Sequence, residues 1–338
     1  MNLLRTGRLT LTALVTPRVA TTSACSGSVG SLDLAALEDN VRRQAASGVT
    51  GLVALGSSGE WSSLAFDAKA TVLEVVGDVE RRRRADDPSA SPLLLTAGTG
   101  GNCPDESREL GEVAAAAGFA ALMVVPPHYY GPMTSKSDLL AYYLEVADSA
   151  PLPVVLYNIP QLTVGVDLTP SMVSKLASHA NVVGIKDSIG SVVRLQQLVA
   201  ATANADDFAV ITGSPSILVP ALMAGAAGSI TGLANVCAAR VEALTAATSA
   251  VLEHGASADR MQAIVREQAA LATANNKLGA YGIPGLKAAV DIAGAGTAGL
   301  PFAPMTPVTG DERDAIAALL DATSGIPLAR PIDPATAL

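Results

Sequence analysis

A lysine and a tyrosine stand at the ends of two short apolar runs. Lys186 follows the run Val182–Ile185, and Tyr157 ends the run Val154–Tyr157. Burial disfavours the ammonium form of a lysine, which leaves an amine nucleophile that can form a Schiff base with a carbonyl compound. A phenol opposite that amine could carry protons to and from the reacting atoms. From position alone, a lysine that pairs with Asp187 and a tyrosine that belongs to the core are open as well.

A glycine-flanked turn, Gly56-Ser-Ser-Gly-Glu60, follows another apolar run. The hydroxyl and backbone N–H groups of Ser57 and Ser58 could hold a carboxylate, as an anion-binding nest does. Taken alone, the segment could be only a turn, in which Glu60 braces the loop and Trp61 covers it. An amine, a phenol and an anion-binding turn at one place would form a site for an oxo acid.

Eight apolar runs over the first 240 residues predict the strands that must position these groups. They are Leu9–Val15, Gly51–Leu55, Leu93–Ala97, Ala121–Val125, Val154–Tyr157, Val182–Ile185, Ala209–Thr212 and Gly228–Thr231. Runs without polar alternation are typical of parallel strands buried on both faces. Helical patterns lie between them, so the sequence predicts an α/β fold, a (β/α)₈ TIM barrel with its active site at the carboxyl ends of the strands. An open doubly wound sheet is the alternative, but no GxGxxG motif follows the early strands.

The strand signals stop after about residue 248. We therefore predict a catalytic barrel over residues 1–248 and a helical C-terminal region with a tail over residues 249–338, the tail starting at about Gly325. The segment Ala20–Ser31 is rich in serine, threonine and glycine, and it predicts a long loop after the first strand that could act as a lid.

Composition excludes several classes of function. The 338 residues include 22 basic and 31 acidic side chains, for a net charge of −9, so nucleic acid is not expected as a partner. The run Arg81–Arg84 is interpreted as the solvated end of a helix. No apolar run is long enough to span a membrane, and no secretory signal is evident. We expect a soluble, cytoplasmic protein.

The cysteines and histidines indicate neither a disulfide framework nor a metal site, because they are scattered without ligand spacing. They are Cys25, Cys103, Cys237, His128, His179 and His254.

Five motifs together resemble the dihydrodipicolinate synthase/N-acetylneuraminate lyase family. They are Gly56-Ser-Ser-Gly-Glu60, Pro126-Pro-His-Tyr-Tyr130, Tyr157-Asn-Ile-Pro160, Gly184-Ile-Lys-Asp-Ser188 and Gly282-Ile-Pro-Gly-Leu-Lys287. The resemblance covers roughly residues 9 to 320. It implies a barrel with C-terminal helices, usually a homotetramer built as a dimer of dimers, or a dimer. It also implies that no cofactor or metal is used, because the protonated lysine imine is the electron sink.

The resemblance assigns a role to each matching residue. Lys186 corresponds to the Schiff-base lysine and Tyr157 to the proton-shuttling tyrosine. Ser57 corresponds to the hydroxyl that relays protons to that tyrosine, and Ser58 to the neighbour that binds the substrate carboxylate. Tyr130 corresponds to the tyrosine that enters the site of the adjacent subunit.

Three further positions correspond to residues around the substrate. Gly213 and Ile230 match positions that line the pocket. Ser188 matches a substrate-contacting residue in the 4-hydroxy-2-oxoglutarate aldolases, which the later motifs resemble more than they resemble the synthases.

One departure from the synthase pattern bears on the substrate. Leu162 stands where dihydrodipicolinate synthases carry an arginine that grips a carboxylate. Our first hypothesis is therefore a lyase that cleaves a 4-hydroxy-2-oxo acid, 4-hydroxy-2-oxoglutarate-like or a deoxy sugar acid, to pyruvate and an aldehyde. One position speaks against a 4-hydroxy-2-oxoglutarate aldolase, because those aldolases usually have asparagine at the position of Ser58. A dihydrodipicolinate synthase, a sugar-acid hydro-lyase using the same imine, and a non-catalytic barrel that binds an oxo acid are the alternatives.

Overall fold

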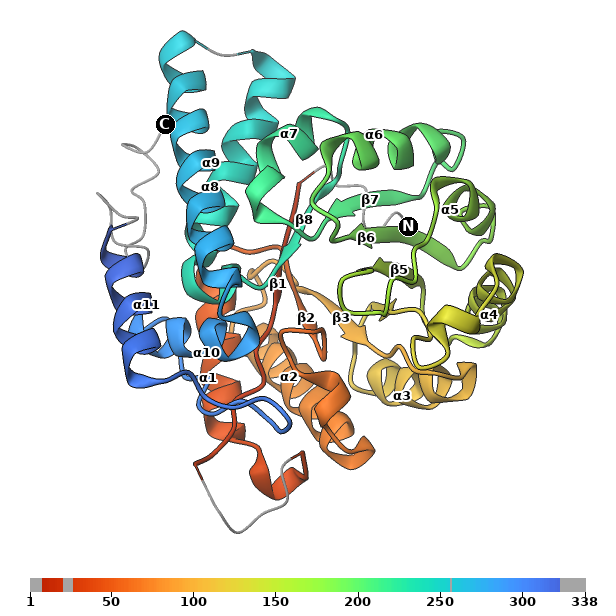
Figure 1. The fold of residues 1–338 in the computed structure, drawn as a ribbon, viewed down its shortest axis with the longest axis horizontal. Helices are drawn as coiled ribbons and strands as arrows, with labels where there is room; N and C mark the ends of the chain where they lie inside the picture. Colours follow the sequence, from red (N-terminus) through yellow and green to blue (C-terminus); the bar gives the residue numbers. More distant parts are fainter. Residues whose placement is uncertain (1–7, 21–26, 256, 323–338) are drawn as a thin grey trace.

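Eight parallel strands close into a barrel, and β1 pairs with β8 to complete it (Figure 1). This computed structural model describes residues 8–20, 27–255 and 257–322. The strands are β1 (Leu9–Ala13), β2 (Gly51–Ala54), β3 (Leu94–Gly98), β4 (Ala121–Val124), β5 (Val154–Asn158), β6 (Val182–Asp187), β7 (Ala209–Thr212) and β8 (Gly228–Thr231). The predicted (β/α)₈ barrel is confirmed.

Helices follow the strands and form the outer layer of the barrel (Figure 1). They are α1 (Leu34–Ala46), α2 (Phe66–Asp86), α3 (Pro104–Ala116), α4 (Lys136–Ser149), α5 (Pro170–Leu176), α6 (Val192–Ala201), α7 (Leu218–Met223) and α8 (Ala234–His254). The short 3₁₀ helices η1 (Val29–Ser31), η2 (Trp61–Ser63), η3 (Gly131–Met133) and η4 (Pro215–Ile217) lie in connecting loops. The predicted division at residue 248 falls inside α8.

The helices α9 (Ala258–Gly279), α10 (Gly282–Ile292) and α11 (Gly310–Ala322) form the C-terminal helical part. They stack on one side of the barrel beside α1 and α8 (Figure 1). Helices α9 and α10 contact α8, and α11 contacts α9 and α10. A helical extension of the barrel, as predicted, is confirmed.

Two apolar layers hold the fold together because the strands are buried on both faces. Inward side chains such as Leu11, Met123 and Ile211 fill the barrel. Outward side chains pack against the helices, whose buried residues recur at helical spacing, as Leu37 and Val41 do in α1. With aromatics at only 3% of the chain, both layers consist mostly of aliphatic side chains.

Of the loop predicted at Ala20–Ser31, the structure describes Ala20 and the residues from Gly27 onward. There, the backbone oxygen of Gly27 accepts a hydrogen bond from the Ala65 N–H at 2.9 Å, which anchors this end of the loop beside the start of α2. The remainder of the loop, including Cys25, and the tail from Gly325 lie outside the described residues.

The arginine run at the end of α2 is paired with carboxylates. Arg81 contacts Asp78 at 2.6 Å, and Arg82 reaches Glu38 of α1 at 3.2 Å. These contacts fit the interpretation of the run as a solvated helix end. In the described part of the chain, no helix is both long and apolar enough to cross a membrane.

Candidate active site

Lys186 and Tyr157 lie side by side at the carboxyl ends of β6 and β5. The two strands are in register at this pair, and both side chains are buried, with exposed fractions of 4% and 3%. The Nζ atom of Lys186 lies 4.2 Å from the centroid of the Tyr157 ring. The structure therefore brings the predicted amine and phenol together inside the mouth of the barrel.

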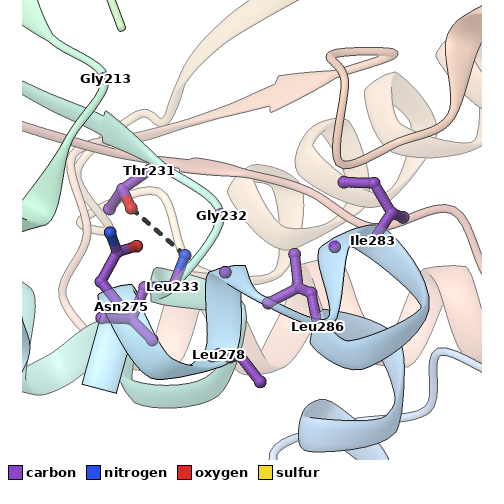
Figure 2. Close-up of a pocket in the computed structure, with 10 residues that line it drawn as sticks. Gly213, Thr231, Gly232, Leu233, Asn275, Leu278, Ile283 and Leu286 are labelled. Atoms are coloured by element: carbon purple, nitrogen blue, oxygen red, sulfur yellow. Dashed lines mark hydrogen bonds between the residues drawn. The ribbon is translucent and has the colours of Figure 1, made fainter. Parts of the chain in front are cut away.

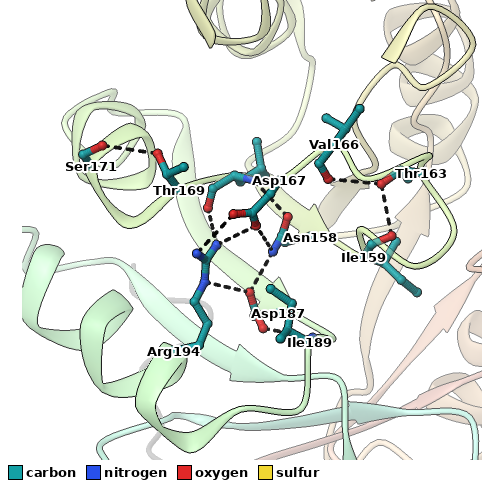
Figure 3. Close-up of polar contacts among 11 residues, drawn as sticks. Asn158, Ile159, Thr163, Val166, Asp167, Thr169, Ser171, Asp187, Ile189 and Arg194 are labelled. Carbon is teal, nitrogen blue, oxygen red and sulfur yellow. Dashed lines mark hydrogen bonds and ion pairs between the residues drawn. The ribbon is translucent and has the colours of Figure 1, made fainter. Parts of the chain in front are cut away.

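Asp187 is directed away from this amine, because successive residues of a strand point to opposite faces. Its carboxylate accepts hydrogen bonds from Asn158 Nδ2 at 2.9 Å and from the Ile189 N–H at 3.1 Å, and it lies 3.4 Å from Arg194 Nε (Figure 3). Within the described residues, Lys186 forms no ion pair. The alternative that Lys186 pairs with Asp187 is therefore wrong.

A polar network behind the site fixes the ends of β5 and β6. Asn158 donates to Asp167 Oδ1 at 3.0 Å as well as to Asp187, and Arg194 donates to the same Asp167 oxygen at 3.0 Å (Figure 3). Burial raises the pKa of the Asp187 carboxyl, whereas the hydrogen bond from Asn158 and the charge of Arg194 lower it. Sequence reasoning missed this network, although Asn158 and Asp187 directly follow Tyr157 and Lys186 in their motifs.

Ser57 approaches the phenol from the turn after β2. Its Oγ lies 3.3 Å from the hydroxyl oxygen of Tyr157, so either group can donate to the other. The neighbouring Ser58 is buried, and a methyl group added at Gly232 would lie 2.7 Å from its Oγ. The serine turn therefore lies between the phenol and the end of β8.

Glu60 braces this turn, as one of the alternatives held. Its Oε2 accepts a hydrogen bond from Lys287 Nζ at 2.6 Å, and its Oε1 accepts one from the Phe302 N–H at 2.7 Å. The amine also donates to the carbonyl oxygens of Thr16 and Leu300. Burial raises the pKa of the Glu60 carboxyl and lowers the pKa of the Lys287 amine, while the attraction between the two opposes both changes.

Gly213 and Ser188 adjoin the lysine at the ends of β7 and β6. A methyl group added at Gly213 would lie 1.9 Å from Ser188 Oγ and 3.2 Å from Lys186 Cε. Ile230 of β8 is buried in the same interior cluster as Tyr157. Gly213 and Ser188 are therefore placed beside the predicted reacting amine, whereas Ile230 is placed in the apolar interior of the barrel that includes Tyr157.

Tyr130 is not brought to this group within one chain. Its side chain is 66% exposed, and its ring packs edge-on against Tyr129 at 4.9 Å between centroids. The Tyr157 hydroxyl is instead paired with Ser57.

A pocket of about 220 Å³ opens beside the serine turn, between the ends of β7 and β8 and the helices α9 and α10 (Figure 2). It is lined by Gly213, Thr231, Gly232, Leu233, Asn275, Leu278, Gly279, Gly282, Ile283 and Leu286. Gly213 adjoins Lys186 and Ser188, and Gly232 adjoins Ser58, so two residues of the pocket lining border the predicted site. The contribution of Asn275, from a helix outside the barrel, was not foreseen from the sequence.

No group of three or more histidine, cysteine, aspartate or glutamate side chains that could hold a metal ion occurs in the described ranges. His128 lies beside Trp61, with ring centroids 6.2 Å apart, and His179 contacts Asp148.

A (β/α)₈ barrel with a buried amine, a phenol and a serine turn at the carboxyl ends of its strands has the architecture of the barrel enzymes, which carry their active sites at that end. The chain belongs to the dihydrodipicolinate synthetase family, whose sequence model matches residues 13–323. This is a family of lyases and aldolases, and the resemblance seen in the motifs is confirmed.

Relatives in this family carry different names. The chain is 35% identical over 207 residues to a "4-hydroxy-tetrahydrodipicolinate synthase" of Methanothrix thermoacetophila, which covers 61% of the chain and 65% of that relative. It is 38% identical over 224 residues to "Putative 2-dehydro-3-deoxy-D-gluconate aldolase YagE" of Escherichia coli, covering 65% and 69%. It is 33% identical over 205 residues to "Probable 4-hydroxy-2-oxoglutarate aldolase, mitochondrial" of Emericella nidulans, covering 61% and 64%.

The solved structure of YagE in complex with pyruvate matches the fold with a TM-score of 0.79 and 27% sequence identity, over 93% of this chain and 98% of that one. The aligned sequences thus span slightly less than two thirds of the first relative, whereas the structural match spans nearly all of YagE.

Proposed function

We propose that the protein is a class I aldolase that reversibly cleaves a 4-hydroxy-2-oxo acid to pyruvate and an aldehyde. The observation that carries the proposal is the position of Lys186 Nζ, 4.2 Å from the centroid of the Tyr157 ring and without a carboxylate partner among the described residues. An amine that is not held in an ion pair can be deprotonated and attack the C2 carbonyl of a bound oxo acid.

The proposed reaction uses one amine and one phenol. Lys186 adds to C2 to give a carbinolamine, and Tyr157 donates its proton to the departing hydroxyl, which leaves as water. The resulting phenolate accepts the proton of the C4 hydroxyl while the C3–C4 bond breaks and its electron pair moves into the protonated imine. The aldehyde leaves and an enamine remains.

The second half of the cycle restores both groups. Tyr157 protonates C3 of the enamine, and water then attacks the imine while the phenolate accepts a proton from that water. Pyruvate leaves and Lys186 is free again. The protonated imine is the electron sink, so we propose that the reaction uses no cofactor. Ser57, whose Oγ lies 3.3 Å from the phenol oxygen, would relay these protons.

The remaining predicted residues hold the substrate in this proposal. Ser57 and Ser58 would bind the carboxylate next to C2 through hydroxyl and backbone N–H groups. Ser188, Gly213 and Ile230 would form the wall around C3 and C4, since Ser188 and Gly213 lie beside the amine and Ile230 is buried in the same interior cluster as the phenol.

A synthase or a sugar-acid hydro-lyase that uses the same imine is a second candidate. The 35% identity to the Methanothrix protein favours it. Leu162, in the position of the synthase arginine, weakens the synthase reading but leaves the hydro-lyase open.

We also propose that the active form is a dimer or a dimer of dimers in which Tyr130 enters the site of the neighbouring subunit. Its exposure in the single chain supports this, because an aromatic side chain placed there is available to a second copy. Cys103 and Cys237 are free thiols, which suits the reducing cytoplasm that we expect for this protein.

Borohydride reduction in the presence of pyruvate tests the proposed chemistry. We expect a reduced pyruvyl adduct on the peptide that contains Lys186 and its loss in Lys186→Ala. Lys175→Ala, which removes a lysine near the end of α5, is the matched control and should keep the adduct. Failure to trap pyruvate, or an adduct confined to another lysine, would rule out both the aldolase and the hydro-lyase and leave a barrel that binds without catalysis.

A further inference from the structure

The pocket beside β7 and β8, into which the second half of the substrate would extend from the amine in the proposed reaction, has an uncharged lining. The ten residues that line the pocket beside β7 and β8 include no acidic or basic side chain. Tyr157, Ser57, Ser58 and Ser188, which face the same mouth, are neutral polar groups. Of the residues described in the structure and placed around the site, Lys186 is thus the single basic one.

Two cations near the site motifs, Lys287 and Arg194, are already engaged, and a third, Lys69, lies over the ring of Trp61, with 5.1 Å between its Nζ and the ring centroid. Lys287 is fully buried and donates to Glu60 at 2.6 Å and to two carbonyl oxygens. Arg194 lies behind the strands, where it contacts Asp167 at 3.0 Å and Asp187 at 3.4 Å (Figure 3). Releasing Lys287 or Arg194 would leave a buried carboxylate without its partner, which is strongly unfavourable.

The loop after β5 presents an apolar side chain at the rim. Gln161 Nε2 donates to the backbone oxygen of Ser188 at 2.6 Å, which holds this loop against the site. The next residue, Leu162, is 59% exposed. The rim therefore offers no guanidinium or ammonium group at this loop to a second anionic group of the substrate.

The pocket itself offers neutral hydrogen-bonding groups at one end and aliphatic side chains at the other. The amide of Asn275 is directed towards Thr231, whereas Leu278, Ile283 and Leu286 occupy the α9–α10 side (Figure 2). Asn275 Nδ2 has two hydrogens, of which one is donated to Ser216 Oγ at 3.0 Å. Such a pocket suits hydroxyl groups on a short carbon chain.

From these features we infer that the aldehyde half of the substrate is uncharged and hydroxylated, so that the oxo acid carries no second carboxylate or phosphate beyond C4. This inference rests on the proposed aldolase function and narrows it. The serine turn is already occupied by the carboxylate next to C2, so a second anion would have to lose its hydration with neither a cation nor an anion-binding turn to compensate, whereas a hydroxylated tail can exchange water for amide and hydroxyl partners.

Matched aldehydes test the inference in the condensation direction with pyruvate. Glycolaldehyde and glyoxylate differ in a hydroxymethyl against a carboxylate, and glyceraldehyde and tartronate semialdehyde differ in the same way with one more carbon. We expect kcat/KM to be at least about 100-fold higher for the neutral member of each pair, as for a charge buried without a partner. A preference for either carboxylated aldehyde would overturn the inference.

Leu162 allows the charge to be restored at the rim. In Leu162→Arg, the ratio of kcat/KM for tartronate semialdehyde to that for glyceraldehyde should rise by about 10-fold or more, the value of one charge-assisted contact. Leu162→Gln, which adds a polar group without charge, should leave this kcat/KM ratio within twofold of the wild-type value. An equal change in both variants would contradict a role for charge.

Trapping keeps this inference separable from the proposed function. If borohydride still links pyruvate to Lys186 while the carboxylated aldehydes react better, the aldolase stands and the neutral-aldehyde inference fails. If pyruvate is not trapped at all, the aldolase itself fails, and with it the inference that depends on it.

Discussion

The Nζ atom of Lys287 lies 2.6 Å from Oε2 of Glu60, although the two residues are 227 positions apart in the sequence. The contact joins α10 of the C-terminal region to the turn that carries Ser57 and Ser58. Glu60 itself has a left-handed backbone, with a φ of 54°, so the turn depends on partners that hold it in place. The C-terminal helices therefore help to position the predicted carboxylate-binding serines.

Removing one member of this pair should strongly destabilise the fold. Lys287→Met leaves the Glu60 carboxylate buried without its cation, and we expect a loss of about 3–5 kcal/mol in the free energy of unfolding. The double variant Glu60→Gln/Lys287→Met should lose less, because no buried charge remains. Denaturant titration measures both, and Lys277→Met, which removes an exposed lysine of α9, is the control. A single variant as stable as the wild type would refute the brace.

The phenol of Tyr157 should affect the rate more than binding. Tyr157→Phe removes the proton carrier but leaves the ring against Lys186, so kcat should fall by about 10²–10⁴-fold. Pyruvate should still be trapped on Lys186, more slowly. Ser57→Ala should lower kcat less than Tyr157→Phe, since a water molecule can take the place of its hydroxyl. Steady-state kinetics would contradict the assignment if Tyr157→Phe changed KM alone.

Gly213 should tolerate no side chain while Ser188 is present. In Gly213→Ala, the new methyl group would lie 1.9 Å from Ser188 Oγ and 3.2 Å from Lys186 Cε, so either the serine or the lysine must move. We expect pyruvate trapping to slow by about tenfold or more, as follows from misplacing a reacting group by a fraction of an ångström. Adding Ser188→Gly should restore the trapping rate in part. No recovery in the double variant would show that the clash lies elsewhere.

The barrel could be predicted from sequence because its signal is local. Apolar runs of four to seven residues mark strands that are buried on both faces, wherever they pair. The residue at which each strand ends is harder to predict, because it depends on backbone conformation and on pairing. Leu55 was expected in β2, but its φ of 58° lies in the left-handed region and ends the strand one residue earlier. Lys186 was expected just after a strand, but pairing with β5 carries β6 on to Asp187.

The supporting contacts of the site could not be predicted, because they join distant segments. Asn158 and Asp187 stood in recognisable motifs, yet Arg194, which completes their network, lies in the first turn of α6 with no motif around it. Glu60 was considered as a brace, but its partner Lys287 is identified only once the chain closes into a barrel. Residues whose side chains reach into the mouth can be predicted from the ends of the strands. The residues that hold them in place are known only from the tertiary structure.

Asn158 should be required for stability rather than chemistry. In Asn158→Leu, two carboxylates and the Leu168 N–H lose partners that the amide now supplies at 2.9–3.0 Å. The Leu168 N–H would be left without a partner at a cost of about 1–3 kcal/mol, and each carboxylate would lose one of its hydrogen bonds while keeping Arg194, so the free energy of unfolding should fall by a few kcal/mol. Asn204→Ala, an exposed change after α6, should stay within about 0.5 kcal/mol of the wild type. A stable Asn158→Leu protein would mean that water replaces the amide.

Tyr130 should act in the site of a neighbouring subunit, if the proposed dimer is correct. Because its side chain is exposed in the single chain, Tyr130→Phe should leave the free energy of unfolding unchanged within about 0.5 kcal/mol. It should nevertheless lower kcat.

Mixing variant subunits decides where the Tyr130 hydroxyl acts. A dimer of one Tyr130→Phe subunit and one Lys186→Ala subunit would contain one site with both Lys186 and an intact Tyr130 from its neighbour. In heterodimers purified from co-refolded mixtures, the activity per Lys186-containing subunit should then be close to the wild-type value. Activity no higher than that of Tyr130→Phe alone would place Tyr130 outside the neighbouring site.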